Sequence, residues 1–197
     1  MESINEVRIE EHDGSLPTVL MIVGSLRKKS FNRQLAQFAA GELADRANVH
    51  MLDWHEVPMF NQDEEFPTPE PVAAVRTEVA EADAIWVVTP EYNHGMPGPL
   101  KNLFDWLSRP MEDGSLSPIV GKMMTMSGAA GASCARDCFA TWLPVLKALK
   151  MCIAPATFTG VALSREMFIS DRLELDDAAK ASMRNQADAL IALIDQE

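Results

Sequence analysis

Residues 90–108 read Pro-Glu-Tyr-Asn-His-Gly-Met-Pro-Gly-Pro-Leu-Lys-Asn-Leu-Phe-Asp-Trp-Leu-Ser, the most informative segment of the chain. The apolar run at 84–88 before it predicts a buried strand, and its Pro-, Gly- and Asn-rich turn leads into an amphipathic helix beginning at Gly98 or Pro99. Such a junction places backbone N–H groups at the carboxyl edge of a parallel sheet, where open α/β folds bind ligands. A second junction of this kind, at 24–32, follows another apolar run, so one sheet should carry two ligand loops.

Strand and helix patterns alternate along the rest of the chain. Strands are predicted at 17–24, 49–54, 84–89, 120–127 and 151–158, and helices at 30–43, 71–82, from 98 or 99, at 132–149 and at 173–194. Pro155 indicates that the last strand lies at an edge or contains a bulge. The alternation predicts one α/β domain over 17–197, a five-stranded parallel sheet with helices on both faces. Residues 1–16 carry five acidic side chains and are predicted to be a flexible polar extension.

Composition excludes several classes of function. A net charge of -12 and a pI near 4.7 argue against binding to nucleic acid or to an anionic membrane. No apolar run approaches the roughly 18 to 20 residues that span a bilayer. The odd number of cysteines disfavours a secreted disulfide framework, so we expect a cytoplasmic protein. Cys134 and Cys138 would share a helix face as core thiols, and no metal site is expected.

The loop at 24–32 has the groups that a phosphate needs. Gly24 allows a sharp turn at the strand tip, Ser25 and Ser30 offer hydroxyls, and Arg27 offers a guanidinium beside a helix N-terminus. The alternative is an ordinary turn whose basic side chains face solvent. The spacing matches neither the Walker loop nor the dinucleotide fingerprint GxGxxG.

Two further loops, at 91–93 and 127–131, could line a planar ligand. Backbone groups of residues 91–93 can follow the polar edge of a ring, although Tyr92 is equally explained as a rim aromatic. The small residues at 127–131 permit close backbone approach to a planar ligand, and a tight packing turn is the alternative. The sequence pairs His94 with no carboxylate, so no catalytic residue is assigned. The long Pro-rich loop at 56–71 is typical of a functional or interface segment.

The segments GSLRKKSFNRQLA (24–36) and PEYNHGMPGPLKNLFDWLSR (90–109) resemble the two signature segments of the NAD(P)H-dependent FMN reductase family. This resemblance implies a flavodoxin-like sheet of order 2-1-3-4-5, bound FMN, and NADPH or NADH as hydride donor. It implies contacts to the phosphate and ribityl chain from Ser25, Arg27, Ser30 and Asn32, to the isoalloxazine from Pro90, Glu91, Tyr92 and Asn93, and a pocket completed by Ser127, Gly128, Ala129 and Gly131.

The resemblance also implies an activity. Hydride would pass to the flavin, and electrons would then pass to a small-molecule acceptor: a quinone, an azo compound, a metal oxyanion or free flavin. A homodimer or homotetramer is expected, with Trp106 and the loop at 56–71 as interface elements. A flavodoxin-type electron carrier is the alternative, disfavoured because Arg27 puts a cation in the phosphate loop. A second alternative is a ligand-binding or interaction module that has this fold but no cofactor.

Overall fold

The computed structural model describes residues 16–196 and contains a parallel sheet of order β2-β1-β3-β4-β5, with β6 also paired to β4. The strands are β1 (Thr18–Val23), β2 (Asn48–Met51), β3 (Ala84–Val88), β4 (Met123–Ala130), β5 (Cys152–Ile153) and β6 (Thr159–Ala162). The helices are α1 (Phe31–Leu43), α2 (Glu70–Glu81), α3 (Gly98–Leu107), α4 (Arg136–Ala148), α5 (Arg165–Ser170) and α6 (Asp177–Ile194), with a 3₁₀ turn η1 (Gln62–Glu64). The predicted flavodoxin-like order is confirmed, and a sixth strand is added.

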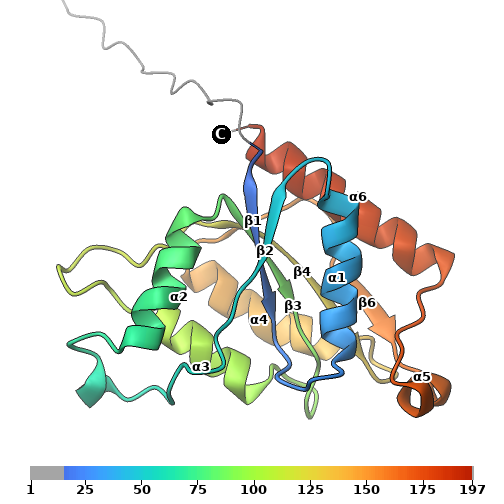
Figure 1. The fold of residues 1–197 in the computed structure, drawn as a ribbon, viewed down its shortest axis with the longest axis horizontal. Coiled ribbons are helices and arrows are strands. Elements are labelled where there is room, and N and C mark those ends of the chain that lie inside the picture. The colour runs from blue at the N-terminus through green and yellow to red at the C-terminus, as the bar shows by residue number, and fades with distance from the viewer. Residues whose placement is uncertain (1–15, 197) are drawn as a thin grey trace, which may run out of the picture.

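Helices cover both faces of the sheet (Figure 1). Helices α1 and α6 pack on one face, and α2, α3 and α4 pack on the other. Successive residues of the central strands serve opposite faces: Val19 and Met21 pack with α1 and α6, whereas Leu20 and Ile22 pack on the other side. This double burial explains why β1 and β3 are nearly continuous apolar runs.

The C-terminal third departs from the predicted boundaries. The strand predicted at 151–158 is divided, because β5 ends at Ile153 and β6 begins only at Thr159, with Pro155 between them. Strand β4 extends to Ala130, so most of the loop predicted at 127–131 is strand. Helix α5 has only six residues and was not predicted. Except for Leu16, the extension predicted at 1–16 lies outside the described residues.

The expectation that Trp106 lies on an interface is wrong. Its side chain is fully buried within the chain, its Nε1 donates to the Pro58 carbonyl at 2.8 Å, and the Phe60 ring lies 4.9 Å away. Trp106 therefore fastens the start of the long loop to α3. Within 16–196, no helix combines the length and hydropathy that crossing a bilayer requires.

Candidate functional site

The three predicted loops meet in one pocket of about 370 Å³ at the carboxyl ends of β1, β3 and β4. This position, beside the point between β1 and β3 where the strand order reverses, is the ligand site of open α/β sheets. The lining residues are Ser25, Arg27, Ser30, Phe31, Asn32, Pro90, Glu91, Tyr92, Ala129, Ala130, Gly131, Leu163 and Phe168.

A larger hollow of about 780 Å³ lies between β6 and the start of α6. Its lining contains two carboxylates, Glu174 and Asp176, and no cationic side chain. A phosphate there would face only like charge. The smaller pocket is therefore the better candidate for an anionic ligand.

Three of the predicted site residues are not in the pocket wall. Asn93 is exposed on the turn after β3. Ser127 is fully buried, donates to Gln186 Oε1 at 2.8 Å and accepts from Trp86 Nε1 at 3.0 Å. Gly128 is held by packing, because a Cβ there would lie 2.5 Å from the Thr89 carbonyl oxygen.

Gly24 in the first loop and Gly131 in the third loop differ in the space that surrounds them. A Cβ on Gly24 would lie 2.8 Å from Leu100 Cδ2, so close packing, rather than the sharp turn expected from the sequence, requires glycine there. A Cβ on Gly131 would have no atom within 4 Å. The added Cβ would therefore face open space at this lining residue.

The cationic end of the pocket is formed where β1 runs into α1. Ser30 caps α1, with its Oγ accepting the Arg33 N–H at 3.2 Å, and Ser25 is buried beside it. The Arg27 guanidinium donates to the Lys29 carbonyl at 2.9 Å and forms an ion pair with Asp171. Asp171 also accepts from Lys29 Nζ at 3.0 Å. The cations at this end are thus shared with one carboxylate.

Asn32 joins the first and third loops. Its Nδ2 donates to the Ala129 carbonyl at 3.0 Å, and its Oδ1 accepts the Ala129 N–H at 2.8 Å. Because Asn32 is buried and both ends of its amide are used, its main effect is to fix α1 against the tip of β4. The pocket wall is therefore held rigidly on this side.

The loop after β3 is a tight two-residue turn. Tyr92 and Gly95 exchange two backbone hydrogen bonds of 3.1 Å, and Asn93 and His94 between them both have positive φ, 51° and 59°. Positive φ at both central residues is the geometry that closes two-residue hairpins. The turn leaves Tyr92 half exposed at the pocket and projects His94 toward α4.

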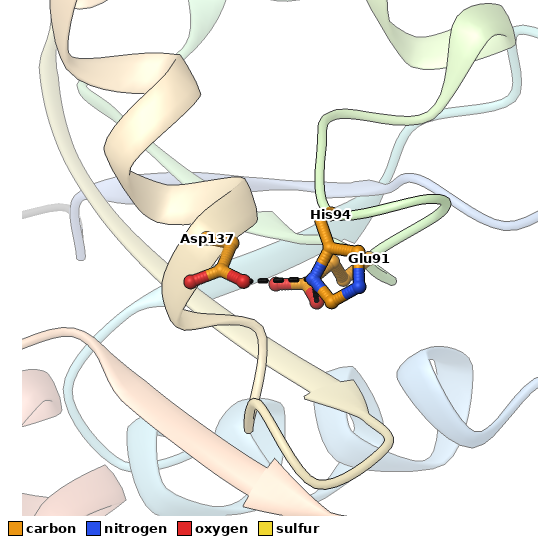
Figure 2. Close-up of side chains that lie close together, drawn as sticks. All are labelled: Glu91, His94 and Asp137. Carbon is orange, nitrogen blue, oxygen red and sulfur yellow. Dashed lines mark hydrogen bonds and ion pairs between the residues drawn. The ribbon is translucent and has the colours of Figure 1, made fainter.

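The turn and α4 bring together Glu91, His94 and Asp137 (Figure 2). His94 Nδ1 lies 2.8 Å from Asp137 Oδ2 and 3.8 Å from Glu91 Oε1. The nearly buried Glu91 accepts the Cys138 N–H at 2.9 Å, at the N-terminus of α4, and also a hydrogen bond from Ser133 Oγ. Ala135, the N-cap of α4, provides no side-chain cap, so Glu91 satisfies that helix end from another loop.

One donor atom from each of these three residues lies within 4.8 Å of the others, a spacing that a metal ion can bridge. Both oxygens of Glu91 already accept hydrogen bonds, and the histidine nitrogen is engaged by Asp137. The geometry is that of an imidazole held between two carboxylates. Sequence patterns do not reveal this cluster, because His94 and Asp137 are 43 residues apart.

Local contacts shift three ionisation equilibria near the pocket. The hydrogen bond from His94, and then that from Arg136, lower the pKa of Asp137. Lys29 and Arg27 lower the pKa of Asp171 in the same way. Burial raises the pKa of the Cys138 thiol to about 11. Cys134 precedes α4, at φ 53°, so the expected shared helix face of the two cysteines does not form.

Comparison with known proteins gives consistent results. The sequence profile of the family described as NADPH-dependent FMN reductase matches residues 17–163. A 2-hydroxy-1,4-benzoquinone reductase from a Burkholderia species is 38% identical over 123 residues, which cover 60% of this chain and 66% of that protein. An NAD(P)H-dependent FMN reductase of Pseudomonas aeruginosa is 38% identical over 113 residues, 57% of this chain and 59% of that protein. The matched region thus spans less than two thirds of these curated relatives.

A solved structure covers more of the chain. The flavoenzyme NAD(P)H:(acceptor) oxidoreductase FerB of Paracoccus denitrificans superposes with a TM-score of 0.79 at 26% identity. The superposition covers 92% of this chain and 98% of FerB. The similarity therefore extends over most of this chain and nearly all of FerB.

Proposed function

The chain belongs to the NADPH-dependent FMN reductase family, and from this premise we propose that it binds FMN and passes electrons from NADPH or NADH to a quinone. The observation that carries the proposal is the convergence of three loops on one pocket with an anion-binding end and a flat, backbone-lined end. Its volume of about 370 Å³ lies in the range of sites for cofactor-sized ligands. A quinone acceptor is supported by the similarity of this chain to the 2-hydroxy-1,4-benzoquinone reductase.

The residues present fit FMN. Ser25, Ser30 and Arg27, together with the N-terminus of α1, would hold the phosphate. The backbone of Pro90, Glu91 and Tyr92 on one side, and of residues 129–131 on the other, would line the ring system. The open space beside Gly131 is compatible with close approach of a planar group. When bound, FMN would supply the two-electron chemistry, while the chain supplies binding and orientation.

We assign His94 the transfer of a proton to the acceptor. Reduction of a quinone to a quinol consumes two electrons and two protons, and the histidine beside Glu91, which lines the pocket, can deliver one proton to a carbonyl oxygen. Nδ1 of His94 faces Asp137 and Glu91, which leaves Nε2 as the donor atom. The two carboxylates would fix the orientation of the ring. His94 is therefore the one catalytic residue that we propose.

The proposal extends to other acceptors and to assembly. Azo compounds, metal oxyanions and free flavin remain alternative acceptors. A homodimer or homotetramer is supported by the exposure of Met59 (77%) and Phe66 (45%) on the long loop. A cytoplasmic location is supported by three free cysteines.

A visible spectrum of the purified chain, followed by anaerobic addition of NADPH, tests the proposal. Oxidised flavin bands that bleach on addition, and catalytic NADPH oxidation with a benzoquinone, are the expected results. A chain that binds FMN but is not reduced by NADPH or NADH would instead be a flavodoxin-type carrier. A chain that takes up no FMN on titration would overturn the proposal.

A further inference from the structure

We propose that Asp171 limits the affinity of the pocket for the phosphate of FMN, and thereby sets how far the protein prefers FMN over riboflavin and how readily it exchanges its flavin. This inference rests on the proposed function. Asp171 lies after α5, 144 residues from Arg27 in sequence, yet its carboxylate binds two of the three cations of the loop at 24–32, Arg27 and Lys29. A phosphate entering this end of the pocket must share Arg27 and Lys29 with that carboxylate or displace it.

The position of Asp171 is fixed by the backbone around it. Gln34 of α1 donates from Nε2 to the Asp171 carbonyl at 3.0 Å, and its Oε1 accepts the Leu173 N–H at 2.8 Å. Asp171 itself has φ 54°, a conformation that Asp and Asn tolerate better than most residues. The carboxylate is therefore held beside the phosphate loop by contacts that do not depend on the ion pair.

Helix α5 also belongs to the pocket. Phe168 lines it, and its ring meets the Phe31 ring edge-on at 5.2 Å, next to the Arg27 guanidinium, which lies 5.3 Å from the centroid of Phe31. Phe168 is still 58% exposed. A half-exposed aromatic and a carboxylate thus reach the same end of the pocket from one short segment.

This segment lies beyond the part of the chain that the family profile matches, which ends at residue 163. The groups that would favour phosphate, at 25–30, lie inside the matched region, and the carboxylate that opposes it lies outside. Asp171 therefore adds a charge to the phosphate end that the matched loops do not contain.

The electrostatic consequence is specific to the phosphate. Arg27 and Lys29 carry two positive charges, and Asp171 cancels one of them before any ligand binds. FMN and riboflavin differ only in the phosphate, so the carboxylate should weaken FMN and leave riboflavin almost unchanged. Because the site is partly exposed, removing this like charge should change FMN affinity by on the order of tenfold.

The test compares the dissociation constants of FMN and riboflavin in the full chain and in Asp171→Asn, by flavin fluorescence titration. The Asn side chain keeps the size and the tolerance of positive φ, and Asp171→Gly provides a second variant if Asn fails to fold. We expect the ratio of FMN to riboflavin affinity to rise about tenfold, and FMN binding to become more sensitive to added salt because the cations are no longer neutralised. Asp177→Asn, an exposed carboxylate in the first turn of α6, is the matched control and should leave the ratio unchanged.

The other outcomes are distinguishable. An unchanged ratio, an equal change for both flavins, or weaker FMN binding in Asp171→Asn would overturn the role of Asp171 and leave the proposed function standing. Failure of the wild-type chain to bind either flavin would overturn the proposed function and this inference with it.

Discussion

Replacing Gln186 with Met should destabilise the protein strongly, because this side chain bridges the break in the fifth strand position of the sheet. Strand β5 pairs with β4 only as far as Ile153 opposite Met124, and β6 takes over at Thr159 opposite Ser127. Between them, Gln186 of α6, fully buried, donates to the Met126 carbonyl at 2.8 Å and accepts the Thr159 N–H at 3.1 Å. The amide thus occupies the place of a missing peptide unit.

The expected magnitude follows from these bonds. Gln186 also donates to Thr125 Oγ1 at 2.7 Å and accepts from Ser127 Oγ, but these hydroxyls can rotate toward other partners. The two backbone groups cannot, and each buried group left without a partner costs about 1–3 kcal/mol. Met conserves volume, so the loss of unfolding free energy should be about 4 kcal/mol. For a domain of this size that corresponds to a decrease in Tm of about 8–16 °C.

Urea unfolding of Gln186→Met and the wild-type chain measures this difference. Gln196→Met is the control, because Gln196 is exposed and its side-chain amide donates to the Ala192 carbonyl at the end of its own helix. Its unfolding free energy should change by less than about 0.5 kcal/mol. A loss below about 1 kcal/mol in Gln186→Met would refute the reasoning, since it would mean that water or other side chains satisfy the two backbone groups.

Three further predictions concern the pocket and the thiols. Gly131→Leu should weaken FMN binding at least about tenfold without unfolding the chain, as measured by flavin titration. Gly128→Ala should instead lower the free energy of unfolding, as measured in urea, because its Cβ would meet the Thr89 carbonyl. His94→Gln should lower kcat for a quinone about 100-fold and leave FMN affinity unchanged, because Gln keeps a polar group but cannot transfer a proton; wild-type kcat in the variant would refute the role. Iodoacetamide at pH 8 should label the exposed Cys152 and spare Cys138, because burial raises the pKa of that thiol to about 11; rapid labelling of Cys138 in the folded chain, read by mass spectrometry, would contradict this.

The sequence predicts the central part of the fold well for a physical reason. Strands β1 and β3 are buried on both faces, so they are short continuous apolar runs that stand out in any chain. Because parallel strands end at one edge, the loops at 24–32 and 90–92 could be placed together from their position in the sequence alone. The same reasoning fails where a strand is broken, since neither β5 nor β6 has the length of a recognisable pattern.

The polar part of the site was harder to predict, because its partners are remote in sequence. Asp171 meets Arg27 across 144 residues, and Glu91 caps α4 across 47. Helix α5 is too short to show a hydrophobic period, so nothing in the sequence brings Phe168 or Asp171 to the pocket. The sequence shows which residues are charged or aromatic, but only the tertiary structure shows which of them contact one another.

The glycines show how the two causes of a small residue can be separated. A pattern of small residues in a ligand loop is equally consistent with close approach of a ligand and with close approach of the chain to itself. The direction of the absent Cβ decides between them: at Gly24, Gly128 and Gly160 it would strike other parts of the chain, and at Gly131 it would not. At Gly128 and Gly160 the obstructing atoms are backbone oxygens, of Thr89 and Cys134, which cannot move without shifting the chain. Substitution should therefore be possible without loss of stability at Gly131, and should cost stability at Gly128 and Gly160.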